Sequence, residues 1–414
     1  MVHRSCLRWF LLAGVVALLT GCSANMAPGS AASTSAQTSP GSGGTGENTG
    51  GSGGGPAFLY VGTDVTPAIQ GYSVDTGSAS LTEVPESPYG EAGAGPVAVI
   101  VNKGNVYSSS TDETTTSGAP FPTGTSTIRW YSADGTSGAL TQAGSLTVPT
   151  TQAALFPEPT GHNLYDIDGN GAIRTLTISG DGSLTAMGSP LTLAGPAVWL
   201  AVSPDGSLMY ATIETGENQD ATWAINRDST TGALTPNHQV SSDHHLYNEA
   251  FDASGRYLLS EWQNQISVDA VDESTGDLTP VAGSPFTTPR SLTESGDTIH
   301  SFGLDPSGRF VYALSFGGNL SVEYVTVFSL AQPTGALTPV QTYDMKPGNP
   351  ASLVADSTLV YEVNYSGSTS GTPGSINVFR RDPASGMLSA GGSSLTVQKG
   401  PDKAAILHSP LPAD

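Results

Sequence analysis

A short turn-and-strand motif recurs seven times along the chain and constrains the fold more than any other feature. Each copy places a leucine directly after a turn of small residues, and these leucines are Leu81, Leu140, Leu184, Leu234, Leu278, Leu337 and Leu388. Successive copies lie 44 to 59 residues apart. Four-stranded units at a spacing of roughly 40–50 residues are typical of β-propellers. We therefore predict an all-β chain that forms a seven-bladed β-propeller with four-stranded antiparallel blades.

One repeat illustrates how the residues specify such a blade. Short runs rich in β-branched and aromatic residues alternate with turns of Pro, Gly, Ser and Asp, as expected for a β-meander. The predicted segments are the strand His300–Leu304, the turn Asp305–Gly308, and the strands Arg309–Leu314, Val322–Leu330 and Leu337–Val340.

The first blade begins without an inner strand. Phe58–Gly62 reads as a second strand and Ile69–Val74 as a third. We predict that Lys403–Leu407, at the other end of the chain, supplies the missing inner strand. This pairing would close the ring and remove its exposed strand edges. The propeller is expected to span residues 57–409.

The N-terminus has the features of a bacterial targeting segment. A basic start with Arg4 and Arg8 precedes the apolar stretch Trp9–Leu19, which is too short to span a bilayer stably. The following Leu-Thr-Gly-Cys resembles a lipobox, in which the cysteine becomes the lipidated first residue. We predict a signal peptide over residues 1–21 and lipidation at Cys22; an ordinary secretory signal with an incidental cysteine is the alternative.

Residues 22–56 are almost entirely Ser, Gly, Ala, Thr and Pro. Such a segment cannot bury enough apolar surface to fold, so a flexible tether is expected. The only other cysteine, Cys6, would leave with the signal peptide, so the mature chain would have no disulfide. We expect a lipid-anchored protein of the cell envelope, at the outer membrane or its periplasmic face, because Ser23 is not an aspartate.

Charge excludes one class of partner. The chain has 14 Lys and Arg against 36 Asp and Glu, with a formal net charge of −22. Nucleic-acid binding requires clustered basic residues, so no nucleic acid is expected. The expected partner is an envelope protein, a glycan or a small molecule, with membrane contact through the N-terminal lipid only. The protein is expected to be a monomer.

The two faces of the predicted ring differ. Turns after the first and third strands of each blade are short, and we call their side the tight-turn face. Loops after the second strand and between blades are longer and more varied, and we call their side the loop face. Binding residues concentrate in variable loops on rigid scaffolds, so function is predicted on the loop face. Its candidate ligand-binding residues are His245, His300 and Trp262; blade packing is the alternative role for Trp262.

A possible cation site lies at residues 166–171. Asp166, Asp168 and Asn170 match the first half of a calcium loop, with Gly171 following. The twelfth position is Thr177, where a glutamate would be needed. A hairpin turn is the favoured interpretation, and no cofactor is expected, with Ca²⁺ as the alternative.

Several repeat segments resemble the lactonase-type seven-bladed propellers, a family that includes 6-phosphogluconolactonase. The matching segments include Thr231–Thr235, Val281–Phe286 and Pro306–Tyr312. The resemblance implies lactone hydrolysis near the channel mouth, with His300 at a catalytic histidine position. In this family the histidine is accompanied by acidic residues, an arginine and a second histidine. Ser315–Asn319 lacks the family's two aspartates, and Pro350–Ser352 lacks its arginine and second histidine. The sequence therefore favours a protein- or glycan-binding module on the loop face, with a lactone hydrolase as the alternative.

Overall fold

The computed structural model describes residues 56–408, except 64–68, 91–95, 103, 115–122, 149–153, 169, 217–218, 242–246, 291–297, 317–322, 346–349, 366–372 and 398–400. The predicted signal peptide, Cys22 and nearly all of the tether lie outside the described residues. Every named element within the described part is a β-strand, and no helix there could span a membrane.

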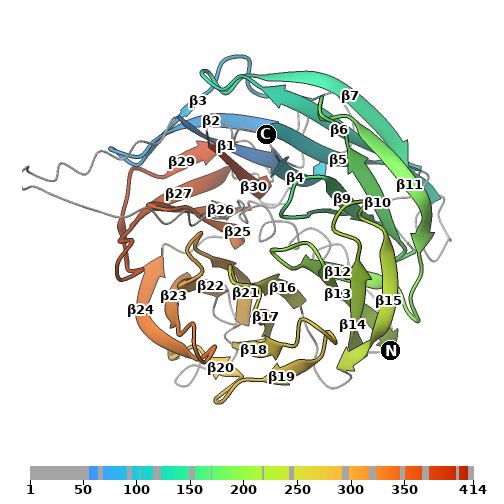
Figure 1. Cartoon of the computed structure of the whole chain (residues 1–414). Helices are drawn as coiled ribbons and strands as arrows, with labels where there is room; N and C mark the ends of the chain where they lie inside the picture. The colour runs from blue at the N-terminus through green and yellow to red at the C-terminus, as the bar shows by residue number, and fades with distance from the viewer. Residues whose placement is uncertain are drawn as a thin grey trace, which may run out of the picture.

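The strands form seven antiparallel sheets arranged around a ring (Figure 1). We number these sheets as blades 1 to 7, each given from its inner strand outward. Blade 1 contains β30 (Pro401–His408), β1 (Ala57–Thr63), β2 (Ile69–Asp75) and β3 (Ser80–Glu83). Blade 2 contains β4 (Pro96–Asn102), β5 (Asn105–Thr114), β6 (Thr123–Ala133) and β7 (Leu140–Val148). Blade 3 contains β8 (Ala154–Pro157), β9 (Asn163–Ile167), β10 (Ile173–Ile178) and β11 (Leu184–Leu191).

The other four blades follow the same plan. Blade 4 contains β12 (Ala197–Val202), β13 (Leu208–Gly216), β14 (Gln219–Arg227) and β15 (Leu234–Ser241). Blade 5 contains β16 (Tyr247–Phe251), β17 (Tyr257–Trp262), β18 (Gln265–Val271), β19 (Leu278–Pro280) and β20 (Phe286–Thr287). Blade 6 contains β21 (Thr298–Leu304), β22 (Phe310–Phe316), β23 (Glu323–Leu330) and β24 (Leu337–Met345). Blade 7 contains β25 (Pro350–Ala355), β26 (Leu359–Asn364), β27 (Gly374–Arg381), β28 (Leu388–Ala390) and β29 (Leu395–Val397). The predicted seven-bladed, all-β architecture is confirmed.

The C-terminal strand closes the ring as predicted. β30 pairs antiparallel with β1, with Leu407 opposite Phe58 and Lys403 opposite Gly62. In Figure 1 the red β30 lies beside the blue β1, so strands from the two ends of the propeller share this blade. Ala404 and Leu407 are buried there. The closing strand is therefore part of the core.

A tyrosine on the second strand of six blades connects each of these blades to the next. In five of them its hydroxyl donates a hydrogen bond to the carbonyl of the glycine in the next blade's repeat turn, at 2.7–3.0 Å. In blade 5, Tyr257 instead donates to the carbonyl of Gln332 at 2.9 Å. The turn glycines need positive φ, as at Gly386 with φ 73°, where a Cβ would also lie 2.3 Å from the Phe310 ring. The recurring Tyr and Gly of the sequence are thus two halves of one contact between blades.

The inner strands are irregular at their loop-face ends. β4, β12, β16, β21 and β25 each show a register shift close to their first residues. A β-bulge of this kind redirects side chains out of the regular pleat. The loop-face mouth of the ring is therefore built from strand segments whose side chains depart from simple alternation.

Candidate functional site

The bulge in β16 places two polar residues inside blade 5. The register shifts between Tyr247 and Ala250, and the intervening Asn248 adopts φ 49°. A left-handed conformation is uncommon outside glycine, although asparagine tolerates it best. Asn248 and Glu249 are both almost fully buried. Backbone irregularities of this kind cluster at binding and catalytic sites.

Glu249 points from blade 5 into contact with blade 4. Its Oε1 accepts hydrogen bonds from the hydroxyls of Thr212 at 2.8 Å and Thr222 at 3.2 Å. Its main-chain carbonyl accepts a hydrogen bond from Nε1 of the buried Trp199 at 2.7 Å. The bulge therefore fixes Glu249 at both its backbone and its side chain.

Glu261 is the second buried acid of the same blade. It lies near the end of β17, where the strand approaches the loop face, and it is 6% exposed. The amide Nδ2 of Asn248 donates a hydrogen bond to Glu261 Oε1. Asn248 thus connects the bulge to the second strand, and we call Asn248, Glu249 and Glu261 the blade 5 acid cluster.

Burial raises the pKa values of both acids in the cluster toward neutral pH. Desolvation raises the pKa of Glu249 to about 7, although its hydrogen bonds from Thr212 and Thr222 act in the opposite direction. Desolvation likewise raises the pKa of Glu261 to about 8, against the hydrogen bond from Asn248. A protonated carboxyl can donate a hydrogen bond as well as accept one. At neutral pH Glu261 is therefore largely protonated, and Glu249 is divided between its protonated and ionised forms.

Three oxygens in the cluster have no hydrogen-bond partner among the described residues. They are Asn248 Oδ1, Glu249 Oε2 and Glu261 Oε2. Blade 7 has a similar group near its loop-face end, where Glu362 Oε2 accepts from Asn377 Nδ2 at 2.7 Å while Glu362 Oε1 and Asn364 Oδ1 have no described partner. Buried polar atoms in folded proteins are normally satisfied, so such atoms indicate a place for water or ligand.

Comparison with known protein families now identifies the chain's relatives. The model of a family described as lactonase, 7-bladed beta-propeller, matches residues 160–351 and 256–402, and together these matches cover more than half of the chain. The chain belongs to this lactonase family. No curated protein matches it.

Solved structures agree with the fold of the lactonase family. A proposed 6-phosphogluconolactonase from Bacteroides fragilis is 16% identical, with a TM-score of 0.64 over 85% of this chain and 98% of the other. One from Bacteroides uniformis is 14% identical, with a TM-score of 0.65 over 85% and 99%. Apo AztD from Citrobacter koseri is 11% identical, with a TM-score of 0.51 over 86% and 98%. At these identities the likeness establishes the architecture alone.

Of the three ligand-binding residues predicted for this lactonase-family chain, Trp262 directly follows Glu261 of the blade 5 cluster, and His300 lies in the neighbouring blade 6. Trp262 is half-buried at the end of β17, directly after Glu261, and Trp262 pairs with Gln265 across a two-residue turn. The backbone amide of Ile299 donates to the carbonyl of Gln263 in that turn at 2.5 Å. This contact places His300, the next residue of β21, at the junction of blades 5 and 6.

His300 occupies the bulge of its own strand, because the register of β21 shifts between Ile299 and Ser301. Its half-buried ring contacts Phe316 edge to face at 5.3 Å. His245, the third predicted residue, lies outside the described residues. Trp199 and Trp130, by contrast, are buried in the hydrophobic cores between blades.

The candidate calcium loop forms a hairpin between β9 and β10. Asp166 Oδ2 accepts a hydrogen bond from Arg174 at 2.7 Å in a buried ion pair. Asp168 Oδ1 accepts hydrogen bonds from the backbone amides of Asn170 at 2.8 Å and Ala172 at 3.0 Å. The carboxylates are thus engaged by protein donors. Within the described ranges, no group of three or more His, Cys, Asp or Glu residues is arranged to hold a metal.

Sequence reasoning missed the blade 5 acid cluster. The signal was present, because the inner strand Tyr-Asn-Glu-Ala-Phe contains two polar residues where the corresponding stretch of β12 reads Val-Trp-Leu-Ala-Val. An acid within a predicted buried strand is unusual enough to attract notice. Contact between Asn248 and Glu261 could not be foreseen, since it depends on the left-handed backbone at Asn248.

Proposed function

We propose that this lactonase-family protein is a lipid-anchored cell-envelope module that binds a glycan or a similar polyhydroxylated ligand on its loop face. The observation that carries the proposal is the blade 5 acid cluster, whose buried acids have raised pKa values and oxygens without a described hydrogen-bond partner. Carbohydrate hydroxyls both donate and accept hydrogen bonds, and so do a protonated carboxyl and an amide. Trp262 beside the cluster offers an aromatic side chain at the same edge.

The cell-envelope part of the proposal rests on the N-terminal sequence. The basic start, the short apolar stretch and Cys22 support lipidation, and the following Ser/Gly-rich segment supports a tether between lipid and ring. Replacing Cys22 by Ala should move the protein from the membrane fraction to the soluble fraction or block its processing. Unchanged partitioning and an unchanged mass would contradict the anchor.

The binding test uses neutral oligosaccharides of bacterial envelope type, measured by calorimetry on the purified protein. Trp262→Ala and Glu261→Met should each weaken binding about tenfold or more, because they remove a stacking surface and a buried hydrogen-bonding pair. Glu261→Gln should bind nearly as well as the native protein, since its amide can still donate and accept. The exposed Met387→Ala on the tight-turn face serves as the matched control. Equal binding by all variants would refute the site.

Lactone hydrolysis is the second candidate function. Family membership favours it, and so do carboxyls whose pKa values lie near neutral pH, where a general acid–base group works best. Hydrolysis would add water to the lactone carbonyl and break the ring C–O bond, giving a hydroxy acid. If the protein is a hydrolase, Glu261→Gln and Glu249→Gln should each impair turnover, because an amide cannot give up and take back a proton as a catalytic carboxyl does. Loss of lactone turnover in the Gln variants, with binding retained, would establish the hydrolase in place of the binding module.

A further inference from the structure

Two buried arginines join neighbouring blades on the tight-turn face. Arg381, at the end of β27 in blade 7, donates through Nε to the hydroxyl of Tyr312 at 2.8 Å and forms an ion pair with Asp305, both in blade 6. Its Nη1 donates to the carbonyl of Ser357, in the turn of its own blade. The guanidinium thus fills a socket built by two blades.

Arg227, at the end of β14 in blade 4, repeats this arrangement against blade 3. It donates through Nε to the hydroxyl of Tyr165, and its Nη2 lies 2.7 Å from Asn163 Oδ1 and 3.5 Å from Glu158 Oε2. Its Nη1 donates to the carbonyl of Gly206 in its own blade's turn at 2.5 Å. In each case the socket consists of a tyrosine, an acid and a turn carbonyl.

The same backbone position exists in the blades between these two. It is the last residue of the third strand, opposite the repeat leucine, and its amide donates to the carbonyl before the second strand at 2.7–2.9 Å. Its occupants in blades 4 to 7 are Arg227, Val271, Leu330 and Arg381. Blade 5 therefore has the shortest side chain of the four at this position.

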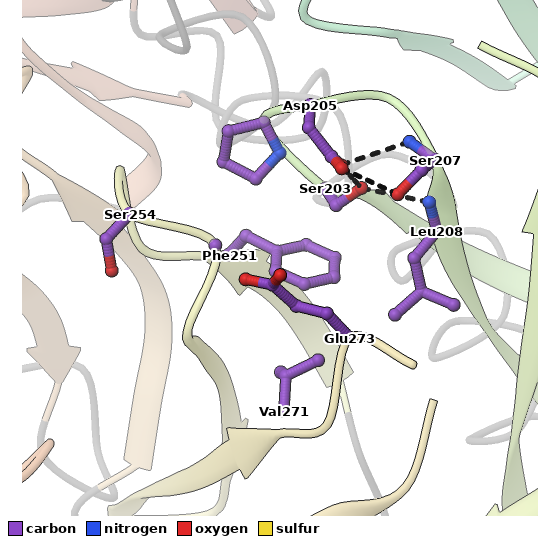
Figure 2. Close-up of a pocket in the computed structure, with 10 residues that line it drawn as sticks. Ser203, Asp205, Ser207, Leu208, Phe251, Ser254, Val271 and Glu273 are labelled. Carbon is purple, nitrogen blue, oxygen red and sulfur yellow. Dashed lines mark hydrogen bonds between the residues drawn. The ribbon is translucent and has the colours of Figure 1, made fainter. Parts of the chain in front are cut away.

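A pocket lies where the arginine of blade 5 would be. It measures about 270 Å³ and opens between blades 4 and 5 on the tight-turn face. Figure 2 shows the hydrogen-bonded Ser203, Asp205 and Ser207 on one side and Val271 on the other, with Phe251 and the Glu273 carboxylate between them. Ser203 and Val271 correspond in position to Asp305 and Arg381 of the filled socket. The pocket thus occupies the position of the filled socket, with Ser203 in place of the acid and Val271 in place of the arginine.

Asp205 accepts hydrogen bonds from Ser203 and Ser207, but two other acceptors of the pocket lining, at Gly255 and Glu273, have no donor among the described residues. The carbonyl of Gly255, also in the lining, corresponds to that of Gly206, and no described residue donates a hydrogen bond to it. In blade 6 the corresponding carbonyl, of Gly308, accepts a hydrogen bond from Gln332 Nε2 at 2.8 Å. Blade 5 has Glu273 at the position of Gln332, and a carboxylate cannot donate. Gly255 and Glu273 thus line the same pocket, and no Lys or Arg is among its lining residues.

The geometry points to a binding site for a guanidinium group, supplied by an arginine side chain of a partner protein. The chain's own Arg227 and Arg381 show that such a socket accepts a guanidinium. Asp205 and Glu273 add negative charge, and Phe251 supplies an aromatic wall for the planar group. Because a guanidinium carries five donors and no acceptor, it complements this lining better than an ammonium does. The site lies on the opposite face from the blade 5 acid cluster and does not depend on the function proposed there.

The test measures the binding of three pentapeptides to the full protein by saturation-transfer NMR. The peptides have blocked, uncharged termini and differ only in their central residue, which is Arg, citrulline or Lys. The arginine peptide should bind saturably in the millimolar range, with citrulline about tenfold weaker, because charge-assisted hydrogen bonds are about twice as strong as neutral ones. Equal binding of arginine and citrulline peptides would overturn the proposal. Free arginine binding tenfold more tightly than the peptide would overturn the assignment to a partner protein.

Two variants locate the binding in this pocket. Val271→Arg supplies the missing side chain, so it should abolish peptide binding and raise the melting temperature. Glu273→Gln copies blade 6 and should weaken arginine binding about tenfold with little change in stability. Glu83→Gln, exposed on β3, is the matched surface control. Retained binding in folded Val271→Arg, or in Glu273→Gln at native strength, would exclude the pocket.

Discussion

Deleting residues 401–414 should abolish cooperative folding of the ring. The deletion removes β30, so blade 1 loses its inner strand and β1 loses its pairing from Ala57 to Thr63. β30 also contacts β25 and β4, the inner strands of the two adjacent blades. The buried Leu59 and Val61 would face water, and β1 would become an exposed edge. We expect a loss of more than about 5 kcal/mol, a large share of the 5–15 kcal/mol by which proteins are usually stable.

Circular dichroism with urea titration measures this effect. A shorter deletion, of residues 409–414, leaves β30 complete and is the control. It should unfold at nearly the native urea midpoint. If the longer deletion also unfolds at the native midpoint with an unchanged m-value, β30 does not hold the ring closed.

The architecture could be predicted because it is encoded locally and repeated. The turn leucines, such as Leu337, occupy the same place in every blade, and each turn needs only neighbouring residues to form. The closure by Lys403–Leu407 could be predicted because every blade has four strands. The first blade begins at its second strand, so another part of the chain has to supply its inner strand. Repetition turned a weak local signal into a reliable one.

The candidate sites could not be predicted in the same way because they depend on contacts between distant residues. Arg381 forms an ion pair with Asp305, which lies 76 residues away in the sequence. From the sequence, Asp305–Gly308 was interpreted only as a turn. Asn248 reaches Glu261 because a bulge rotates it out of the pleat. His300 was predicted to begin its strand, whereas β21 begins at Thr298 and His300 lies at a bulge that was not visible in the sequence. The pocket at Val271 becomes apparent only when blades are superimposed in register.

Stability should fall as the pH rises from about 5 to 8, and the blade 5 acid cluster should cause much of the fall. In the unfolded chain each glutamate has its ordinary pKa of 4.5, whereas the folded protein raises the pKa of Glu249 to about 7 and of Glu261 to about 8. The folded state thus holds more protons in this window, so raising the pH favours unfolding. At 1.36 kcal/mol per pKa unit, the loss is about 3 kcal/mol for Glu249 and somewhat more for Glu261.

The double variant Glu249→Gln and Glu261→Gln isolates this contribution. Its amides stay neutral at every pH, so the free energy of unfolding should vary much less between pH 5 and 8 and should exceed the native value at pH 8. His408, whose pKa is raised by its ion pair with Asp356, also releases a proton as the pH rises. That release is common to both proteins and cancels when the native and variant slopes are compared. Glu83→Gln should keep the native slope, since Glu83 is exposed on β3. Urea titrations at four pH values measure the slopes, and identical slopes for the native protein and the double variant would mean that neither carboxyl keeps its proton in the folded state.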